Sequence, residues 1–92
     1  MIVKVKFGYC DSDQDEDFEK FIVDTEKLKK NKRASVKLVL DIVKDAVDDV
    51  ENEVSVDDEI AGAFDSAIMD GVVDTNIAKY SHDAEVTVWR GG

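Results

Sequence analysis

The sequence predicts one compact α+β domain, in which two or three helices pack against a small sheet that includes both ends of the chain. The terminal segments alternate apolar and polar residues as β-strands do. The middle of the chain instead repeats apolar residues with helical spacing. A length of 92 residues leaves room for one hydrophobic core, so a single domain is expected to span residues 1–92.

The predicted strands are residues 2–9 and 84–90. In each of them apolar side chains alternate with charged or polar ones, so one face should meet the helices and the other should meet solvent. The residues assigned to the apolar faces are Val3, Val5, Phe7, Val86, Val88 and Trp89. Short amphipathic strands are not stable as isolated ribbons. We therefore expect the two terminal strands to be neighbours in one sheet.

The first predicted helix covers residues 35–52. Its apolar residues recur at i, i+3, i+4 and i+7, which places them in one continuous stripe. The stripe consists of Val36, Val39, Leu40, Val43, Ala46, Val47 and Val50. Ser35 is placed to cap the amino end of the helix. Because valine lowers helix propensity, this helix should depend on tertiary burial for its stability.

The second predicted helix covers residues 56–70. Its apolar stripe consists of Val56, Ile60, Ala63, Phe64 and Ala67. Ser55 and Asp58 have the spacing of a capping box, although Asp stands in place of the usual Glu or Gln. Gly71 suits the position just after the helix. Because only a few residues join the two helices, we expect them to form an antiparallel hairpin.

Two segments allow alternative structures. Residues 17–30 place Phe18, Phe21 and Leu28 on one helical face, but a strand through residues 18–24 competes with that helix. Residues 72–80 fit either a strand hairpinned onto residues 84–90 or an ordered loop.

The chain is strongly acidic, with 22 acids against 12 bases and a net charge of −10. Such a charge repels nucleic acid and anionic membranes, so the expected partner is a protein with a basic surface. No apolar run approaches the roughly 20 residues of a membrane span. The single cysteine, Cys10, excludes an intrachain disulfide and favours a reducing, cytoplasmic location. Excess charge can also serve solubility alone, with no partner involved.

Aspartates recur on the face of the 35–52 helix opposite its valine stripe, and Leu38 and Ile42 flank them. Apolar residues beside carboxylates are typical of a protein interface, because apolar burial supplies affinity while charge supplies steering. The start of the second helix adds further acids. The predicted partner-binding residues are Leu38, Asp41, Ile42, Asp45, Asp48, Asp49, Asp57 and Asp58. The alternative is a solvated face whose two apolar residues pack within the fold.

A basic segment, residues 27–37, lies between acidic stretches and contains no acid of its own. It has no interleaved aromatic residues, which argues against nucleic-acid binding. We expect it to offset acids within the fold or in a second subunit.

The aspartate run from Asp11 to Asp17 resembles a calcium loop but fails its requirements. Counted from Asp11, the sixth and twelfth positions hold Glu16 and Ile22, where an EF-hand needs Gly and Glu. We therefore predict no metal site, and no motif calls for a cofactor.

Cys10 and His82 would come together if the terminal strands paired antiparallel, with Asp83 beside them. A thiol, an imidazole and a carboxylate could form a nucleophilic or metal site. Acidic neighbours disfavour the reactive thiolate, however, and no further histidine or cysteine completes a zinc site.

These observations favour a small acidic protein-binding module over an enzyme. One form of it is an inhibitor that occupies the basic cleft of a nucleic-acid-binding protein, as small acidic phage and mobile-element products do; size and charge are the only basis of that analogy. The first alternative is a structural subunit of a homodimer or larger complex. The second is a thiol or metal-dependent enzyme that uses Cys10 and His82.

Overall fold

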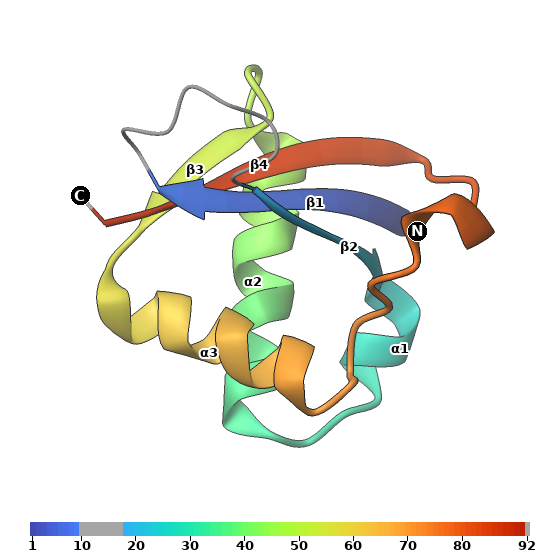
Figure 1. The fold of residues 1–92 in the computed structure, drawn as a ribbon, viewed down its shortest axis with the longest axis horizontal. Coiled ribbons are helices and arrows are strands. Elements are labelled where there is room, and N and C mark those ends of the chain that lie inside the picture. Colours follow the sequence, from blue (N-terminus) through green and yellow to red (C-terminus); the bar gives the residue numbers. More distant parts are fainter. Residues whose placement is uncertain (10–17, 92) are drawn as a thin grey trace.

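A computed structural model describes residues 1–9 and 18–91 of the chain. These residues form β1 (Ile2–Tyr9), β2 (Glu19–Asp24), α1 (Thr25–Lys29), α2 (Ala34–Asp48), β3 (Glu53–Val56), α3 (Asp58–Met69), the 3-10 turn η2 (Ile77–Lys79) and β4 (Ala84–Arg90). The helices lie together on one side of the sheet, which gives the molecule two layers (Figure 1). The predicted α+β class is therefore confirmed.

The sheet has the strand order β2-β1-β4-β3. β1 pairs antiparallel with β2, whereas β4 lies parallel to both β1 and β3. The first and last strands are therefore neighbours, as expected, and Figure 1 shows them side by side at the centre of the sheet. Parallel neighbours need a crossover connection, and α3 supplies the one between β3 and β4.

The two faces of the sheet differ in chemistry. Val3, Val5 and Phe7 of β1 face the helices and are buried, as the alternation predicted. The assignment of Trp89 to the same side was wrong. Val86 and Val88 are buried, but Trp89 pairs in register with Gly8 and packs edge-on against Phe18, with ring centroids 5.1 Å apart. A side chain at Gly8 would come within 2.6 Å of the Phe18 ring, so glycine makes room for this aromatic pair.

The core lies between the helices and the sheet. The Phe64 ring of α3 stacks on Phe7 with centroids 5.0 Å apart and also contacts Phe21 of β2 at 6.2 Å. These three rings connect α3 with the two strands at one edge of the sheet. The buried residues of α2 are Val36, Val39, Leu40, Val43 and Ala46, all members of the predicted stripe.

The predicted bounds of α2 were too long at the carboxyl end. Its last helical residue is Asp48, and the residue before its first turn is Arg33. Ser35 therefore lies inside the helix, and its assignment as the cap was wrong. Val50 was also assigned wrongly, because it lies beyond the helix with 99% of its surface exposed. The apolar spacing continued past the point where the backbone left the helix.

A strand, β3, separates α2 from α3, so residues 53–56 were predicted wrongly as linker and helix. Ser55 belongs to this strand, and Asp57 caps α3 instead by accepting a hydrogen bond from the Ile60 amide at 3.0 Å. With a strand between them, the helices do not form a simple hairpin, and α3 runs across the end of α2 (Figure 1).

The carboxyl end of α3 follows the prediction. Gly71 adopts φ +71° and donates to the Ile68 carbonyl at 3.2 Å, while Val72 donates to Ala67 at 3.0 Å. This pair of bonds is the Schellman arrangement, in which the left-handed residue is most often glycine.

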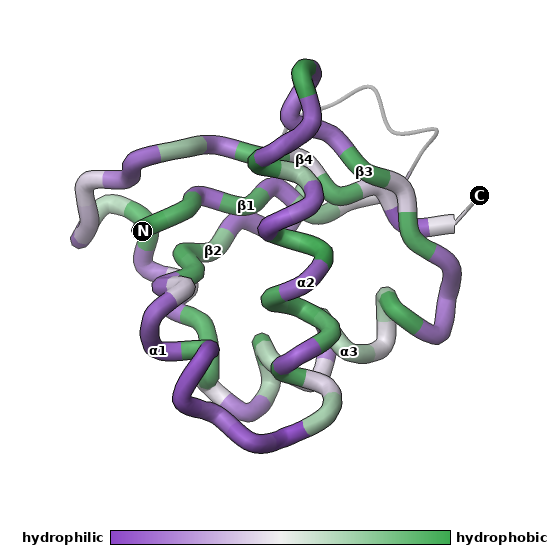
Figure 2. Tube along the Cα trace, turned by 180° about the vertical axis from the view of Figure 1, so that it is seen from behind, coloured by the Kyte–Doolittle hydropathy of each residue, from purple (hydrophilic) through white to green (hydrophobic). Residues whose placement is uncertain are grey.

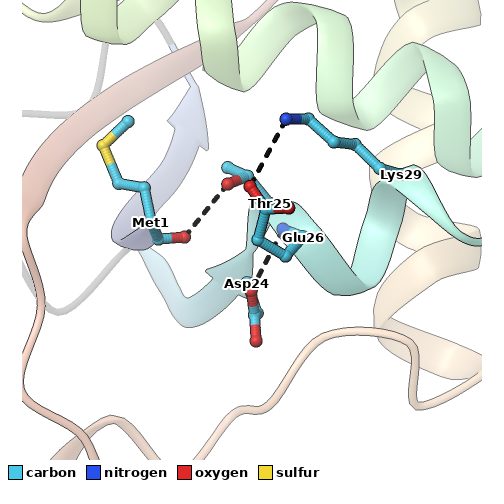
Figure 3. A network of polar contacts seen from close by, with 5 residues as sticks. All are labelled: Met1, Asp24, Thr25, Glu26 and Lys29. Carbon is cyan, nitrogen blue, oxygen red and sulfur yellow. Dashed lines mark hydrogen bonds and ion pairs between the residues drawn. The ribbon is translucent and has the colours of Figure 1, made fainter.

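Both ambiguous segments contain more than one kind of structure. Residues 19–24 form β2 and residues 25–29 form α1, so strand and helix follow one another. Thr25, the first residue of α1, anchors the amino terminus. Its amide and its hydroxyl both donate to the Met1 carbonyl, at 3.0 and 3.2 Å (Figure 3). Residues 72–80 form an ordered loop, which bonds to the outer edge of β2 through Ile22 and Asp74.

Candidate functional site

The outer face of α2 carries a row of exposed carboxylates. Asp41, Asp45 and Asp48 are all exposed, and they lie opposite the buried stripe. Their i, i+4 and i+7 spacing puts neighbours about 4.5–6 Å apart along the helix axis. Leu38 continues the same row one turn earlier and is 42% exposed. An apolar side chain therefore borders the acids on the surface, as predicted.

These carboxylates have no cationic partner within the described chain. The ion pairs of the described residues lie elsewhere: Lys29 with Glu26, Arg33 with Asp70, His82 with Glu85 and Arg90 with Asp65. Lys44 lies on the same helix but forms no ion pair with a described residue. Lys37 is likewise exposed without an ion pair to a described residue, and these two lysines lie one turn from Asp41 and Asp48. The helix face therefore presents charges of both signs to solvent, with acids in excess.

The loop between α2 and β3 extends this surface. It projects from the body of the molecule, with hydrophilic flanks and a hydrophobic tip (Figure 2). The tip is Val50, between Asp49 and Glu51. The Asp49 carboxylate accepts from the Glu51 amide at 2.9 Å, and the Asp49 carbonyl accepts from Asn52 at 3.0 Å. Local hydrogen bonds thus hold an apolar side chain in water among acids.

Val50 was missed as a surface residue because its spacing fits the buried stripe. The run of acids around it, from Asp48 to Glu51, was the signal that could have identified a solvated loop.

The other predicted partner-binding residues do not all lie on this surface. Ile42 is half-buried and packs against the core, so it belongs to the fold more than to the surface. Asp57 and Asp58 are exposed, but they follow β3 in the chain, whereas Asp49 precedes it. The four residues of β3, which span about 13 Å, separate Asp49 from these two acids. We define the acidic surface as Leu38, Asp41, Asp45, Asp48, Asp49 and Val50.

The basic segment is partly neutralised within the fold. Arg33 pairs with Asp70 at 2.8 Å, and Lys29 pairs with Glu26 of its own helix at 3.3 Å (Figure 3). These contacts agree with the expectation that this segment offsets acids of the same chain.

The proposed meeting of Cys10 and His82 is contradicted by the strand direction. Because β1 and β4 are parallel, Tyr9 pairs with Arg90 and not with the start of β4. Asp83 lies at the other end of β1, where its carboxylate accepts from the Ile2 amide at 2.8 Å. The length of β1, about 23 Å, separates Ile2 from Tyr9. Cys10 itself, like the Asp11–Asp17 run, lies outside the described residues.

A small hollow lies where the 72–80 loop meets the sheet. Its volume is about 190 Å³, and it is lined by Ile2, Ile22, Asp24, Lys27, Val72, Asp74 and Tyr80. Ligand pockets usually measure about 300–1,000 Å³, so this hollow suits no more than a very small molecule. Within residues 1–9 and 18–91, no group of His, Cys, Asp and Glu side chains is arranged to hold a metal ion.

Asp74 in this hollow is stabilised as a carboxylate. The backbone amide of Asn76, which donates at 2.9 Å, and the Tyr80 hydroxyl hold the pKa of Asp74 below its usual value. The same hydrogen bond to Asp74 raises the pKa of Tyr80.

Comparisons with protein-family models, with curated proteins and with solved structures returned no match for this chain. What the fold and the surface define is therefore a class: a small α+β domain with an acidic helix face and an exposed apolar tip. None of its described helices has the length and apolar character needed to cross a membrane.

Proposed function

We propose that this protein is a protein-binding module whose acidic surface captures a partner with a basic surface. The observation that carries the proposal is that Asp41, Asp45 and Asp48 are exposed without an ion pair in the described chain, beside the exposed Leu38 and Val50. Complementary charge speeds encounter, and apolar contacts then hold the complex.

The partner class that suits this surface best is a nucleic-acid-binding protein with an unoccupied basic cleft, and the module would act as its inhibitor. Duplex DNA carries about one charge per 1.7 Å of axis, whereas the row on α2 provides about one per 4.5–6 Å. The helix alone therefore reproduces only part of that density. Asp49, Glu51 and the acids at the start of α3 would have to contribute the remainder.

The test begins with capture of the partner from a host extract at low salt, followed by association kinetics with the purified partner. The Asp41→Lys/Asp45→Lys variant should slow association markedly, and raised salt should slow the wild type in the same way. The matched control is Glu26→Lys/Glu85→Lys, which changes net charge equally at residues of α1 and β4 outside the acidic surface. If both variants slow association by the same factor, net charge alone is responsible and the acidic surface is not the site.

The apolar residues should act after encounter. Leu38→Ala and Val50→Ala should mainly speed dissociation, because apolar contacts form once the partner has docked. Neither change should unfold the protein, since both side chains are exposed. If neither variant changes the dissociation rate, Leu38 and Val50 are not part of the interface. If the only partner captured is the chain itself, the structural-subunit alternative replaces the proposal.

A further inference from the structure

One edge of the sheet is open in the part of the chain that the structure describes. β3 is the outermost strand on its side, with β4 beside it and the helices beneath it (Figure 1). The Asn52 and Val56 carbonyls accept from Thr87 and Gly91 of the β4 side, at 2.9 and 3.2 Å. Because backbone groups alternate in direction along a strand, those of Glu53 and Ser55 point away from the sheet.

The opposite edge is not open in this way. The 72–80 loop bonds to the middle of the outer side of β2 at one residue: the Ile22 amide donates to the Asp74 carbonyl at 2.7 Å, and the Asp74 amide donates to the Ile22 carbonyl at 3.2 Å. An unpaired strand edge is a ready template for another strand, and β3 is where the described chain presents one.

Acidic residues lie at both ends of this edge. Asp49, Glu51 and Glu53 stand at the start of β3, and Asp57, Asp58 and Glu59 follow its end. None of them forms an ion pair with a described residue. Pairing of β3 with β3 of a second copy would bring these acids together, which is unfavourable. The charge instead complements an extended basic segment.

The side chains of β3 specify the pattern such a segment would need. Val54 and Val56 face the helices, whereas Glu53 and Ser55 face the other side and are exposed. In a strand paired with β3, every second side chain lies on the face of Val54 and Val56, and the side chains between them lie on the face of Glu53 and Ser55. Basic side chains would therefore accompany Glu53, and β-branched apolar ones would extend the core beside the valines.

We propose that β3 accepts an extended segment of the partner protein, with alternating lysine or arginine and β-branched residues, as a fifth strand of the sheet. This inference rests on the proposed function, because it specifies how a basic partner is held. The acidic surface on α2 would steer the partner, and hydrogen bonds to the backbone of Glu53 and Ser55 would fix the register of its strand.

The probe is a synthetic peptide of alternating lysine and valine, compared with a peptide of the same composition in which lysines and valines are in separate blocks. Two further versions of the alternating peptide carry N-methyl groups on every second backbone amide. One version is methylated at the odd-numbered amides and the other at the even-numbered amides. The alternating peptide should bind, and one N-methylated version should bind about tenfold more weakly or worse, since two backbone hydrogen bonds are lost. Amide exchange at Glu53 and Ser55 should slow when the peptide is bound.

The protein variant is Ser55→Pro, which removes one outward N–H at an edge position where proline is tolerated. It should weaken the alternating peptide, while its unchanged melting temperature would show that the sheet is intact. Equal binding of the alternating and block peptides, or no effect of either N-methylated version, would overturn strand addition. If the captured partner still responds to Asp41→Lys/Asp45→Lys in that case, the proposed function survives and only this inference fails. If the partner responds to neither the charge reversal nor Ser55→Pro, both fail.

Discussion

The guanidinium of Arg33 donates to the carboxylate of Asp70 at 2.8 Å, and this bond joins the residue before α2 to the residue that ends α3. Both side chains are about half exposed, at 58% and 44%. An exposed ion pair contributes about 0–1 kcal/mol to stability. A double-mutant cycle with Arg33→Ala and Asp70→Ala, followed by denaturant unfolding, should give a coupling energy in that range. A coupling above about 2 kcal/mol would mean that the pair holds the helix crossing together.

The core should be sensitive at the centres of its two helices. Val43 and Phe64 are both fully buried, and Phe64 stacks on Phe7. Val43→Ala and Phe64→Ala should each lower the free energy of unfolding by about 1–4 kcal/mol, with Phe64→Ala the larger because it leaves the bigger cavity. The matched control is Val50→Ala, which should change stability by no more than about 0.5 kcal/mol because Val50 is exposed. Equal losses for Val43 and Val50 would contradict the exposed position of the loop.

Two glycines of the α3 region should respond to alanine with opposite signs. Gly71 has φ +71° and open space around it, so Gly71→Ala should cost about 1 kcal/mol through backbone strain alone. Gly62 lies inside α3, faces solvent and has nothing within 4 Å of an added methyl group. Gly62→Ala should therefore stabilise the protein by about 0.5–1 kcal/mol. Thermal unfolding of both variants checks this prediction. Destabilisation by Gly62→Ala would show that another part of the chain lies against this position.

The Asp74–Tyr80 pair predicts a pH dependence at both extremes. The pKa of Asp74 is lowered from 3.8, so its contribution to stability is complete above that value and is lost as pH falls through the lower folded pKa. The pKa of Tyr80 is raised from 10.0, so its contribution is complete below that value and is lost as pH rises through the higher folded pKa.

An NMR titration of the Asp74 carboxyl carbon tests the pair directly. In Tyr80→Phe the pKa of Asp74 should move upward but stay below its usual value, because the Asn76 amide still donates to it and is the larger cause. An identical titration in wild type and variant would show that the hydroxyl does not reach the carboxylate in solution.

Local pattern determined the elements whose residues alternate or repeat without interruption. Strands at 2–9 and 84–90 appear with the predicted bounds, because one face of each is buried and a two-residue period records that burial. The buried stripe of α2 and the glycine after α3 were predicted for comparable reasons, namely helical period and a left-handed backbone. The exposed acids of α2 also follow from the helix period, since residues opposite a buried stripe face solvent.

Only the tertiary structure decided where those patterns stop and how the strands are joined. Val50 continues the spacing of the stripe, but the helix ends at Asp48 so that residues 53–56 can pair with β4, and Val50 is left in water. A four-residue strand carries too little pattern to be distinguished from the start of a helix. The direction of β4 was likewise set at long range, by the crossover through α3, and that direction places the start of β4 beside Val3 and not beside Tyr9. Strand direction is a property of chain connection, and no local spacing of side chains records it.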